Sequence, residues 1–416
     1  MDKKYKNLKY GCYMMSMSMS VVANLSPVLF ITFRELYGIS YSALGFLILV
    51  NFVTQLSVDL IFSFFSHKFN IEKTVKSMPI ITLIGLLTYS LLPLLFPSAA
   101  YVGILIGTVI FSAASGLAEV LTSPVIAAIP AENPEREVGK LHSVYAWGVV
   151  AIIIFATAYL LVFDNKTWWV LSLIFTAIPL TGAALFAKSE IPKMETPKRV
   201  SGALHLLGNR GLWLSVFGIF LGGAAECTMA QWCSGYIERA LGIPKFWGDV
   251  FGVAGFALML GIGRTLYSKY GKCTERFLLF GAIGATVCYF VAATVNVELI
   301  GLIACAMTGF FAATLWPGGL IVASERFPTG GVFVYAIMAA GGDLGASVTP
   351  QLVGIVTDSV IASSFAVDLA LRYGITVEQL GMKFGMLTGM LFPLVAIFVY
   401  LVLYKTRKDK KLKNAN

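Results

Sequence analysis

Two carboxylates stand in the middle of long apolar stretches, where a charge is costly. Glu119 lies in the segment Ser115-Gly-Leu-Ala-Glu-Val-Leu-Thr-Ser-Pro124, and Glu226 lies near the centre of a later apolar run. An ionisable side chain at mid-depth of a bilayer costs about 3 kcal/mol or more, so it usually faces a polar interior. A carboxyl group in such a place can take up and release an ion. Both residues are therefore candidates for ion coupling, although a neutral Glu226 bonded to a backbone carbonyl is a structural alternative.

The segment around Glu119 has a counterpart later in the chain. In Gly309-Phe-Phe-Ala-Ala-Thr-Leu-Trp-Pro317 a glycine and a proline are again eight residues apart, as they are around Glu119. Ala312 takes the place of the carboxylate in this copy, and Trp316 adds an indole ring. The pattern predicts a duplicated fold in which one half supplies a carboxylate and the other supplies a ring for stacking.

A polar stripe marks the second apolar run. Asn51, Gln55 and Asp59 follow one another at i, i+4 and i+8, which places them along about 12 Å of one helix face. The two amides suit either hydrogen bonds to a solute or hydrogen bonds that fix two helices together. Asp59 is closer to the inner end, and its charge fits either a gate contact or an ion-coupling role.

Other polar and aromatic side chains suit the recognition of a polyol. Gln231 offers an amide for hydroxyl groups, and Trp232 offers a flat apolar face for the C–H side of a sugar ring. A residue of the membrane's aromatic belt is the alternative for Trp232. The full set of predicted substrate-binding residues is Asn24, Asn51, Gln55, Tyr145, Gln231, Trp232 and Trp316.

A gate is predicted from Asp343, which lies in the glycine-rich stretch 341–345 and needs a partner. Arg264, at the inner end of the eighth apolar run, is a suitable one, and the pair would form a cytoplasmic latch. No nucleophile–base pair, metal-ligand cluster or phosphate loop is present in the sequence, so we expect neither an enzyme nor a cofactor.

Composition assigns these residues to a membrane protein. Of the 416 residues 57% are hydrophobic and only 13% are charged, with a mean hydropathy of +0.80. The net charge of +9 does not indicate nucleic acid, because the basic residues lie in short loops between apolar runs. The six cysteines show neither disulfide nor metal-ligand spacing.

Twelve apolar runs are long enough to span a bilayer. They cover about 10–33, 42–65, 77–96, 101–129, 140–162, 167–187, 212–236, 247–268, 276–295, 299–323, 332–360 and 383–404. Most of the 31 Lys and Arg fall in inside loops when both termini are cytoplasmic, as the positive-inside rule requires. The chain is thus predicted to be an all-α, multi-pass plasma-membrane protein.

The longest connection, residues 189–210, divides the chain into two six-span bundles, 1–188 and 211–416. Further matches between the halves support the division: residues 67–70 correspond to 268–271, and 34–39 correspond to 239–243. Two such halves with a binding site at mid-depth are the plan of a transporter. The loop 361–381 is expected to hold a short helix on the membrane surface.

With these residues the chain resembles the major facilitator superfamily, and within it the fucose–proton symporter family. That family carries an intramembrane Glu in a Gly-Leu-x-x-Leu-Glu-x-x-x-Asn-Pro pattern. Gly116, Glu119 and Pro124 form a comparable pattern here, in which Ser123 replaces the Asn. Segments 22–25 and 341–350, the latter followed by Gly354 and Asp358, resemble the family's spans 1 and 11.

The resemblance implies twelve transmembrane helices in two pseudo-symmetric bundles, with spans 1, 4, 7 and 10 lining a cavity. It also implies ion-coupled import of a small polar solute, for which a monosaccharide is expected, by a monomer in the lipid bilayer. The chain departs from the family where Pro27 replaces an Asp that is thought to take the proton and where Tyr145 replaces a cavity-lining Asn. Residues 67–70 also depart from the superfamily's acidic signature.

The coupling ion therefore stays open between H+ and Na+, with Glu119, Glu226 and Asp59 as its candidate ligands. Two other functions also stay open. A proton-driven exporter of amphiphilic cations would use two such carboxylates as well. A non-transporting membrane sensor or a lipid-handling protein would show no saturable solute flux.

Overall fold

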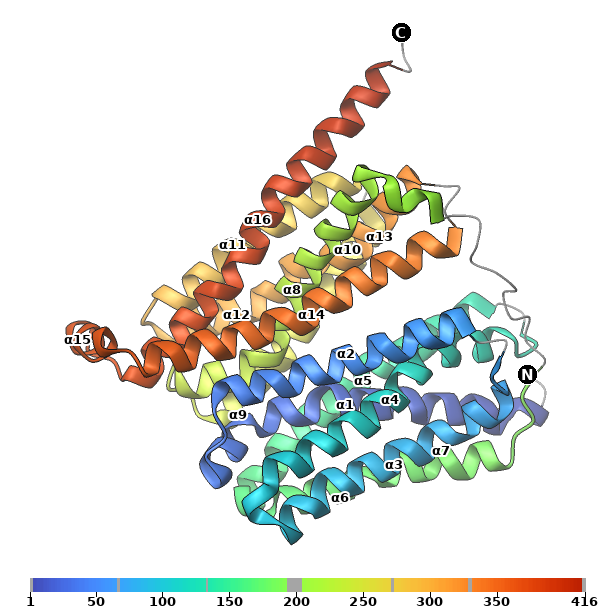
Figure 1. The fold of residues 1–416 in the computed structure, drawn as a ribbon, viewed down its shortest axis with the longest axis horizontal. Helices are drawn as coiled ribbons and strands as arrows, with labels where there is room; N and C mark the ends of the chain where they lie inside the picture. Colours follow the sequence, from blue (N-terminus) through green and yellow to red (C-terminus); the bar gives the residue numbers. More distant parts are fainter. Residues whose placement is uncertain are drawn as a thin grey trace. The chain divides into compact units, whose positions relative to one another are not determined.

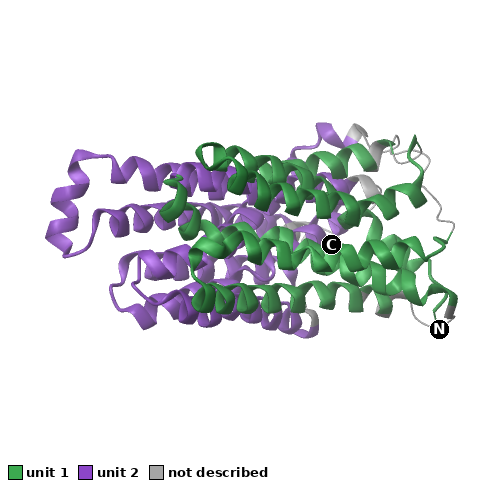
Figure 2. Cartoon of the chain, turned by 90° about the horizontal axis from the view of Figure 1, so that it is seen from below, with its two compact units in different colours: residues 1–39, 50–199 green, residues 40–49, 200–416 purple. Residues whose placement is uncertain are grey.

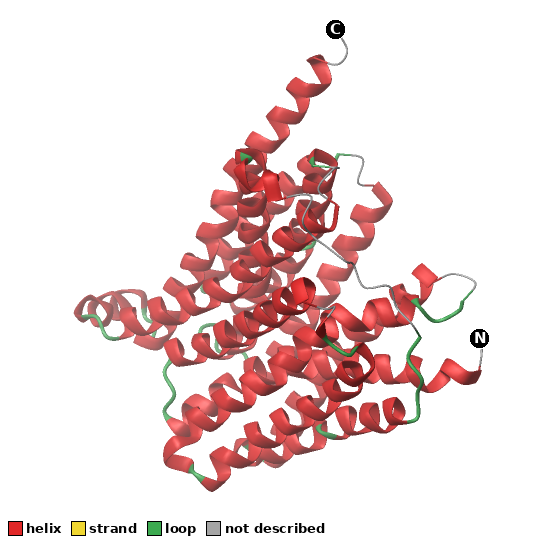
Figure 3. Ribbon diagram, turned by 45° about the vertical axis from the view of Figure 1, so that its right-hand side comes forward, coloured by secondary structure: helices red, strands yellow, loops and turns green. Residues whose placement is uncertain are grey.

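The structure is a computed structural model that describes residues 3–65, 68–131, 134–192, 204–270, 273–327 and 331–413. These residues form helices joined by short loops, and none of them is in a strand (Figure 3). Twelve helical stretches among them are long and apolar enough to cross a membrane: Lys6–Tyr37, Tyr41–Phe62, Ile71–Leu95, Pro97–Ala127, Lys140–Phe163, Asn165–Ala187, Arg210–Arg239, Lys245–Tyr267, Thr274–Thr294, Glu298–Arg326, Val334–Ile361 and Val377–Thr406. The prediction of an all-α protein with twelve spans is confirmed.

The helices follow the chain in the order shown in Figure 1. The N-terminal part comprises α1 (Lys6–Tyr37), α2 (Tyr41–Phe65), α3 (Ile71–Leu95), α4 (Ala100–Ala127), α5 (Pro134–Phe163), α6 (Trp168–Phe175) and α7 (Ala177–Ala187). The C-terminal part comprises α8 (Arg210–Arg239), α9 (Lys245–Trp247), a π-helix (Gly248–Val253), α10 (Ala254–Tyr270), α11 (Thr274–Thr294), α12 (Glu298–Ala312), α13 (Leu315–Arg326), α14 (Gly331–Ile361), α15 (Ser364–Tyr373) and α16 (Val377–Lys413).

Two of the spans are broken in the middle, and a proline follows each break within a few residues. A proline has no N–H, so it cannot donate to the carbonyl four residues before it. Pro179 follows the break between α6 and α7, and Pro317 follows the break between α12 and α13. The carbonyls that lose their helical donor are those of Phe175 and Ala313.

The chain divides into two compact units (Figure 2). Unit 1 comprises residues 1–39 and 50–199, and unit 2 comprises residues 40–49 and 200–416. The first turns of α2 therefore belong to unit 2, although the rest of that helix belongs to unit 1. The predicted domain limits remain a prediction, and residues 193–203 of the predicted linker lie outside the described residues.

Unit 1 is held together by close helix contacts that glycine permits. A Cβ on Gly107 of α4 would lie 2.5 Å from the backbone nitrogen of Tyr89 on α3, and one on Gly85 would lie 2.6 Å from the backbone nitrogen of Phe111. The Trp168 ring lies edge-on to Phe33 and Tyr89 in the same core. Any larger residue at these glycines has to push α3 and α4 apart.

In unit 2 a glycine likewise permits close contact between two helices, α8 and α14. A Cβ on Gly345 would lie 2.0 Å from the carbonyl oxygen of Phe220.

The loop 361–381, which was predicted to hold a short helix, contains the helix α15, and this helix ends at Gly374 in the left-handed conformation. Ala366 and Ala370 of α15 are buried, so this helix packs one face on unit 2. Its position on a membrane surface remains a prediction.

The glycine contacts give a matched pair of substitutions with opposite expected effects. Gly107→Ala places its methyl group inside the van der Waals radius of α3 and should lower the melting temperature by several degrees. Gly261→Ala meets no atom within 4 Å and gains helix propensity, so it should leave the melting temperature unchanged or raise it. Thermal unfolding of both variants in detergent measures the difference, and equal melting temperatures would contradict the packing.

Candidate functional site

A polar seam joins α2 and α4 inside unit 1. The Ser112 hydroxyl donates to Oδ1 of Asn51 at 2.6 Å, and Nε2 of Gln55 donates to the same oxygen at 2.7 Å. One turn further on, the Ser115 hydroxyl donates to Oε1 of Gln55 at 3.2 Å. The predicted stripe thus faces α4, and its two amides make the interhelical hydrogen bonds that were the alternative to solute contacts.

Asp59 continues this seam on α2. A Cβ on Gly116 would come within 3.0 Å of Oδ1 of Asp59 and 2.8 Å of the carbonyl oxygen of Gln55. The missing side chain at position 116 therefore lets α2 approach α4 and brings the Asp59 carboxylate against it. Glu119 follows three residues later on α4. Two carboxylates are thus supplied to one seam by neighbouring helices.

The helical register of α4 shows which face carries Glu119, whose side chain is exposed. At 100° per residue, Glu119 lies about 20° from Ser112 and about 40° from Ser115, both of which bond to α2. Exposed apolar residues of α4 begin with Val102, which lies about 100° away on the same projection. Glu119 is therefore aligned with the polar seam and not with the apolar face.

The remaining predicted residues of unit 1 lie on α1 and α5. Nδ2 of Asn24 donates to the Ser20 carbonyl at 2.9 Å, and the Ser20 hydroxyl donates to the Tyr145 carbonyl at 2.9 Å. The Tyr145 side chain is half-buried. Ser123 extends the polar seam toward α5, with its hydroxyl 3.5 Å from Nε2 of His142.

Unit 2 holds an ion pair in place of a lone carboxylate. Nη2 of Arg264 on α10 donates to Oε1 of Glu226 on α8 at 2.9 Å. Nε of the same arginine donates to the Ala313 carbonyl at 3.4 Å. This carbonyl is the one that Pro317 deprives of its helical donor. The guanidinium group therefore satisfies a carboxylate and a backbone oxygen that the broken span exposes.

This ion pair differs from the partners that the sequence predicted for Arg264 and Glu226. Arg264 was predicted to latch onto Asp343, and the structure shows it bonded to Glu226. Glu226 was a candidate for coupling or for a neutral carboxyl bonded to a backbone carbonyl, and it has a cationic partner. Sequence patterns missed this pairing because it depends on how α8 and α10 are rotated. The pairing of Arg264 with Asp343 remains a prediction.

The two tryptophans predicted to contact a solute in unit 2, Trp232 and Trp316, differ in their exposure. Trp232 is only 1% exposed, its Nε1 donates to the Pro350 carbonyl at 3.0 Å, and its ring packs against Tyr41. The assignment of Trp232 as a stacking face is therefore corrected, because both ring faces are covered. The neighbouring Gln231 is also buried.

Trp316 is half-buried and lies in a slot made by two glycines. A Cβ on Gly223 would be 3.0 Å from its ring, and one on Gly342 would be 2.6 Å away. The indole therefore touches both α8 and α14 and keeps part of its surface accessible. It is the one predicted aromatic of unit 2 whose exposure fits contact with a solute.

A clasp that the sequence analysis did not assign holds the first turn of α2 to unit 2. Asp358, in the last turns of α14, accepts hydrogen bonds from the backbone N–H of Tyr41 at 3.2 Å and of Ser42 at 2.6 Å, and from the Ser42 hydroxyl at 2.7 Å. The Tyr41 hydroxyl donates to Oε1 of Glu378 at 2.6 Å. A carboxylate at a helix N-terminus satisfies free N–H groups and the helix dipole. The sequence feature that belongs to this clasp is the pair Gly354 and Asp358, which lie one helical turn apart on α14.

Comparisons with known proteins were made on sequence and on structure. The family model described as Major Facilitator Superfamily matches residues 10–350. No curated protein sequence matches the chain significantly.

Three similar solved structures agree in fold. A bacterial homolog of the human lysosomal transporter Spinster, inward-facing and unoccupied, has a TM-score of 0.74 at 13% identity and covers 98% of each chain. A D-xylose–proton symporter has a TM-score of 0.69 at 15% identity and covers 94% of this chain and 97% of its own. The fucose:proton symporter of E. coli has a TM-score of 0.56 at 14% identity and covers 95% of this chain and 99% of its own. At such identities the likeness concerns the fold alone.

The clasp predicts a local change when its charge is removed. Asp358→Asn keeps an acceptor but loses the charge that three donors share, so amide hydrogen exchange in the first turn of α2 should speed up about tenfold. Asp368→Asn on the exposed surface of α15 is the matched control and should change nothing there. Unaltered exchange at residues 41–44 in Asp358→Asn would show that the clasp does not hold this turn.

The ion pair predicts a non-additive pair of substitutions. Glu226→Gln leaves the Arg264 charge without its carboxylate, and Arg264→Gln leaves Glu226 alone, so each should lower the melting temperature clearly. The double variant removes both charges and should be more stable than the sum of the single losses, by about 1–3 kcal/mol. Thermal unfolding of the four proteins gives this coupling, and strictly additive losses would argue against the pair.

Proposed function

Because the chain belongs to the major facilitator superfamily, we propose that it is a secondary active transporter that imports a small polar solute by ion-coupled alternating access. Transport itself is the activity of the superfamily. The proposed refinements are import, ion coupling and a monosaccharide as solute. We further propose a monomer in the plasma membrane, with both termini in the cytoplasm where the basic loops lie.

The observation that supports ion coupling is the α2–α4 seam of unit 1. Asp59 and Glu119 are placed on facing helices among amide and hydroxyl groups, and Glu119 is exposed on the polar side of α4. A site of this kind can bind a proton or a sodium ion, because it offers carboxylate charge next to neutral oxygen ligands. Protonation or sodium binding there would favour one conformation of the transporter by linkage.

The contacts in unit 2 narrow the choice between the two mid-depth acids. Glu226 already has the positive charge of Arg264 beside it, so taking up a cation would first require this pair to separate. No described ion pair of Glu119 would have to separate before it takes up a cation. We therefore assign coupling to Glu119 with Asp59 near it, and solute contact in unit 2 to Trp316.

A sugar is the favoured solute because Trp316 keeps part of its indole ring accessible for stacking, and because two structural neighbours are sugar–proton symporters by name. The main alternative is export of amphiphilic cations, which the two candidate carboxylates Glu119 and Glu226 would also suit. Counterflow in proteoliposomes against a sugar panel, repeated under imposed pH and sodium gradients, separates the two. Saturable sugar counterflow supports the proposal, and efflux of a cationic dye without sugar counterflow overturns it.

The role of Glu119 is tested by removing its charge alone. Glu119→Gln should reduce accumulation of solute against its gradient at least tenfold while exchange of solute across the membrane persists, because exchange needs no net ion movement. Glu298→Gln, an exposed carboxylate in the first turn of α12, is the matched control and should accumulate normally. Full accumulation by Glu119→Gln would remove this residue from coupling.

A further inference from the structure

Arg264 has more hydrogen-bond donors than its described contacts use. Nη2 donates to Oε1 of Glu226 at 2.9 Å, and Nε donates to the Ala313 carbonyl at 3.4 Å. A guanidinium group carries five N–H donors in one plane, so these two contacts leave three for other acceptors. The three belong to Nη1 and to the second N–H of Nη2, and they form the outer edge of the group. Because the Arg264 side chain is 47% exposed, a solute can approach it.

The helical register of α10 places Arg264 away from the exposed apolar side of this helix. The exposed apolar residues of α10 include Leu258, Ile262 and Leu266. At about 100° per residue they lie about 120–160° from Arg264 around the helix axis. The exposed surface of Arg264 therefore belongs to a different face of α10 from the residues that suit contact with lipid.

Trp316 is placed one turn away from the contacts of Arg264. Its ring meets Gly223 of α8, where a Cβ would be 3.0 Å away, and Gly223 comes three residues before Glu226. Trp316 itself comes three residues after Ala313, whose carbonyl accepts from Arg264. Three residues of a helix rise by about 4.5 Å. The half-buried indole ring and the exposed guanidinium side chain thus lie on neighbouring turns of the same segments.

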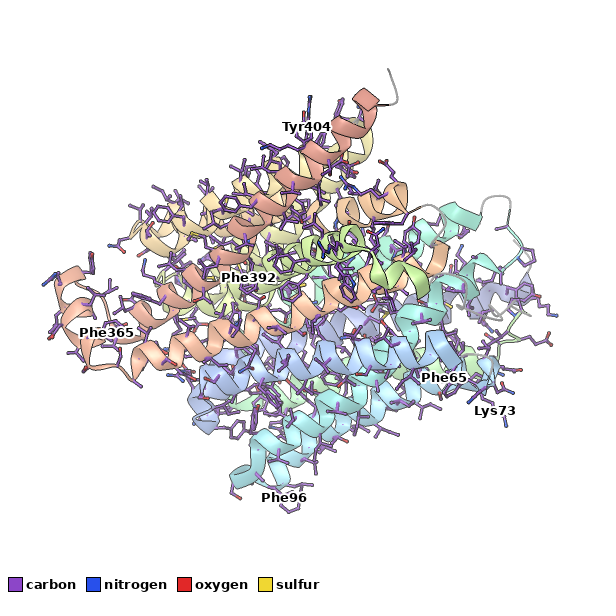
Figure 4. The ribbon with its side chains drawn as sticks, turned by 45° about the horizontal axis from the view of Figure 1, so that its top comes forward. Phe65, Lys73, Phe96, Phe365, Phe392 and Tyr404 are labelled. Atoms are coloured by element: carbon purple, nitrogen blue, oxygen red, sulfur yellow. The ribbon has the colours of Figure 1, made fainter. Side chains whose placement is uncertain are left out.

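The helix α8 is also fixed by α16. The Tyr400 hydroxyl of α16 donates to the Gly218 carbonyl at 2.8 Å. The ring of Phe392, which is labelled on α16 in Figure 4, has its centre 6.3 Å from that of the Phe220 ring of α8. Packing within unit 2 therefore sets the position of α8 before a solute binds, which limits the entropy lost on binding.

The ion pair determines which acceptors suit the remaining donors of Arg264. Glu226 already offsets the charge of this arginine, so a solute carboxylate would bring a second negative charge to one cation. Hydroxyl and ring oxygens add no charge and still accept strong hydrogen bonds from a guanidinium group. Neighbouring donors in one plane match two neighbouring hydroxyl groups on a ring. A neutral polyol therefore fits this edge better than an anion.

We propose that Arg264 determines the specificity of the solute site, because its outer edge donates to two adjacent hydroxyl groups of a neutral monosaccharide whose C–H face packs on Trp316. This inference rests on the proposed function, since it refines the solute contact assigned there to Trp316. Nη2 and Nε stay bonded to Glu226 and Ala313, and these two acceptors orient the guanidinium plane. Ion coupling then belongs to unit 1, and solute recognition in unit 2 has a charged donor.

Competition by deoxy sugars in the counterflow assay tests this assignment. The probes are D-glucose, D-galactose, D-mannose and L-fucose, and each monodeoxy analogue of the best of them is the competitor. Loss of either hydroxyl group that bonds to Arg264 should weaken competition about tenfold in the wild-type chain, because a charged donor loses its acceptor. Arg264→Lys keeps a cation beside Glu226 but removes the planar edge. In this variant the two analogues should compete within about threefold of the parent sugar.

Two further variants separate recognition by Arg264 from general effects. Each ratio of analogue to parent sugar is measured within one variant, so it does not depend on how much of that variant folds. Arg372→Lys on the exposed surface of α15 is the matched control and should keep the wild-type ratios. Trp316→Leu should weaken the parent sugar and every analogue by the same factor, because stacking does not depend on one hydroxyl group.

The outcomes distinguish this inference from the proposed function. Saturable sugar counterflow together with wild-type ratios in Arg264→Lys would overturn the role of Arg264 and leave the proposed transport standing. D-glucuronate that competes better than D-glucose in the wild-type chain would overturn a neutral solute. No counterflow with any of the sugars would contradict the proposed sugar transport, and this inference with it.

Discussion

A charge inside hydrocarbon needs a partner, because no water is present to solvate it. The described residues meet this requirement in two ways. Unit 2 pairs Glu226 directly with Arg264, so the two opposite charges offset each other. Unit 1 instead supplies Asp59 and Glu119 to a seam between α2 and α4, in which Asn51, Gln55 and Ser115 bond to one another. The first arrangement pairs opposite charges within the protein, and the second is the one that we propose takes up an ion.

The same requirement extends to the backbone. Pro317 deprives the Ala313 carbonyl of its donor, and Arg264 provides another one from α10. One guanidinium group thus links the broken span, through Ala313, to the carboxylate of α8. Loss of this arginine would expose two unsatisfied acceptors together, which is why the pair and the helix break are best regarded as one structural element.

The sequence predicted what depends on composition and local spacing. Twelve spans followed from hydropathy, and the spacing of Asn51, Gln55 and Asp59 correctly placed them on one face. Which helix that face meets could not be read from spacing, since Gly116 had to be brought against α2 first. The burial of Trp232 and the partner of Arg264 were missed for the same reason. Both depend on the rotation of packed helices, on which local sequence carries little information.

The helix α2 has its first turns in unit 2 and the rest of its length in unit 1. Its first turn is fixed to α14 by Asp358, and the residues beyond Leu49 are built into unit 1 through Asn51 and Gln55. One continuous helix carries both sets of bonds. The rotation of its first turn about the helix axis therefore also fixes the direction in which Asn51 and Gln55 face α4.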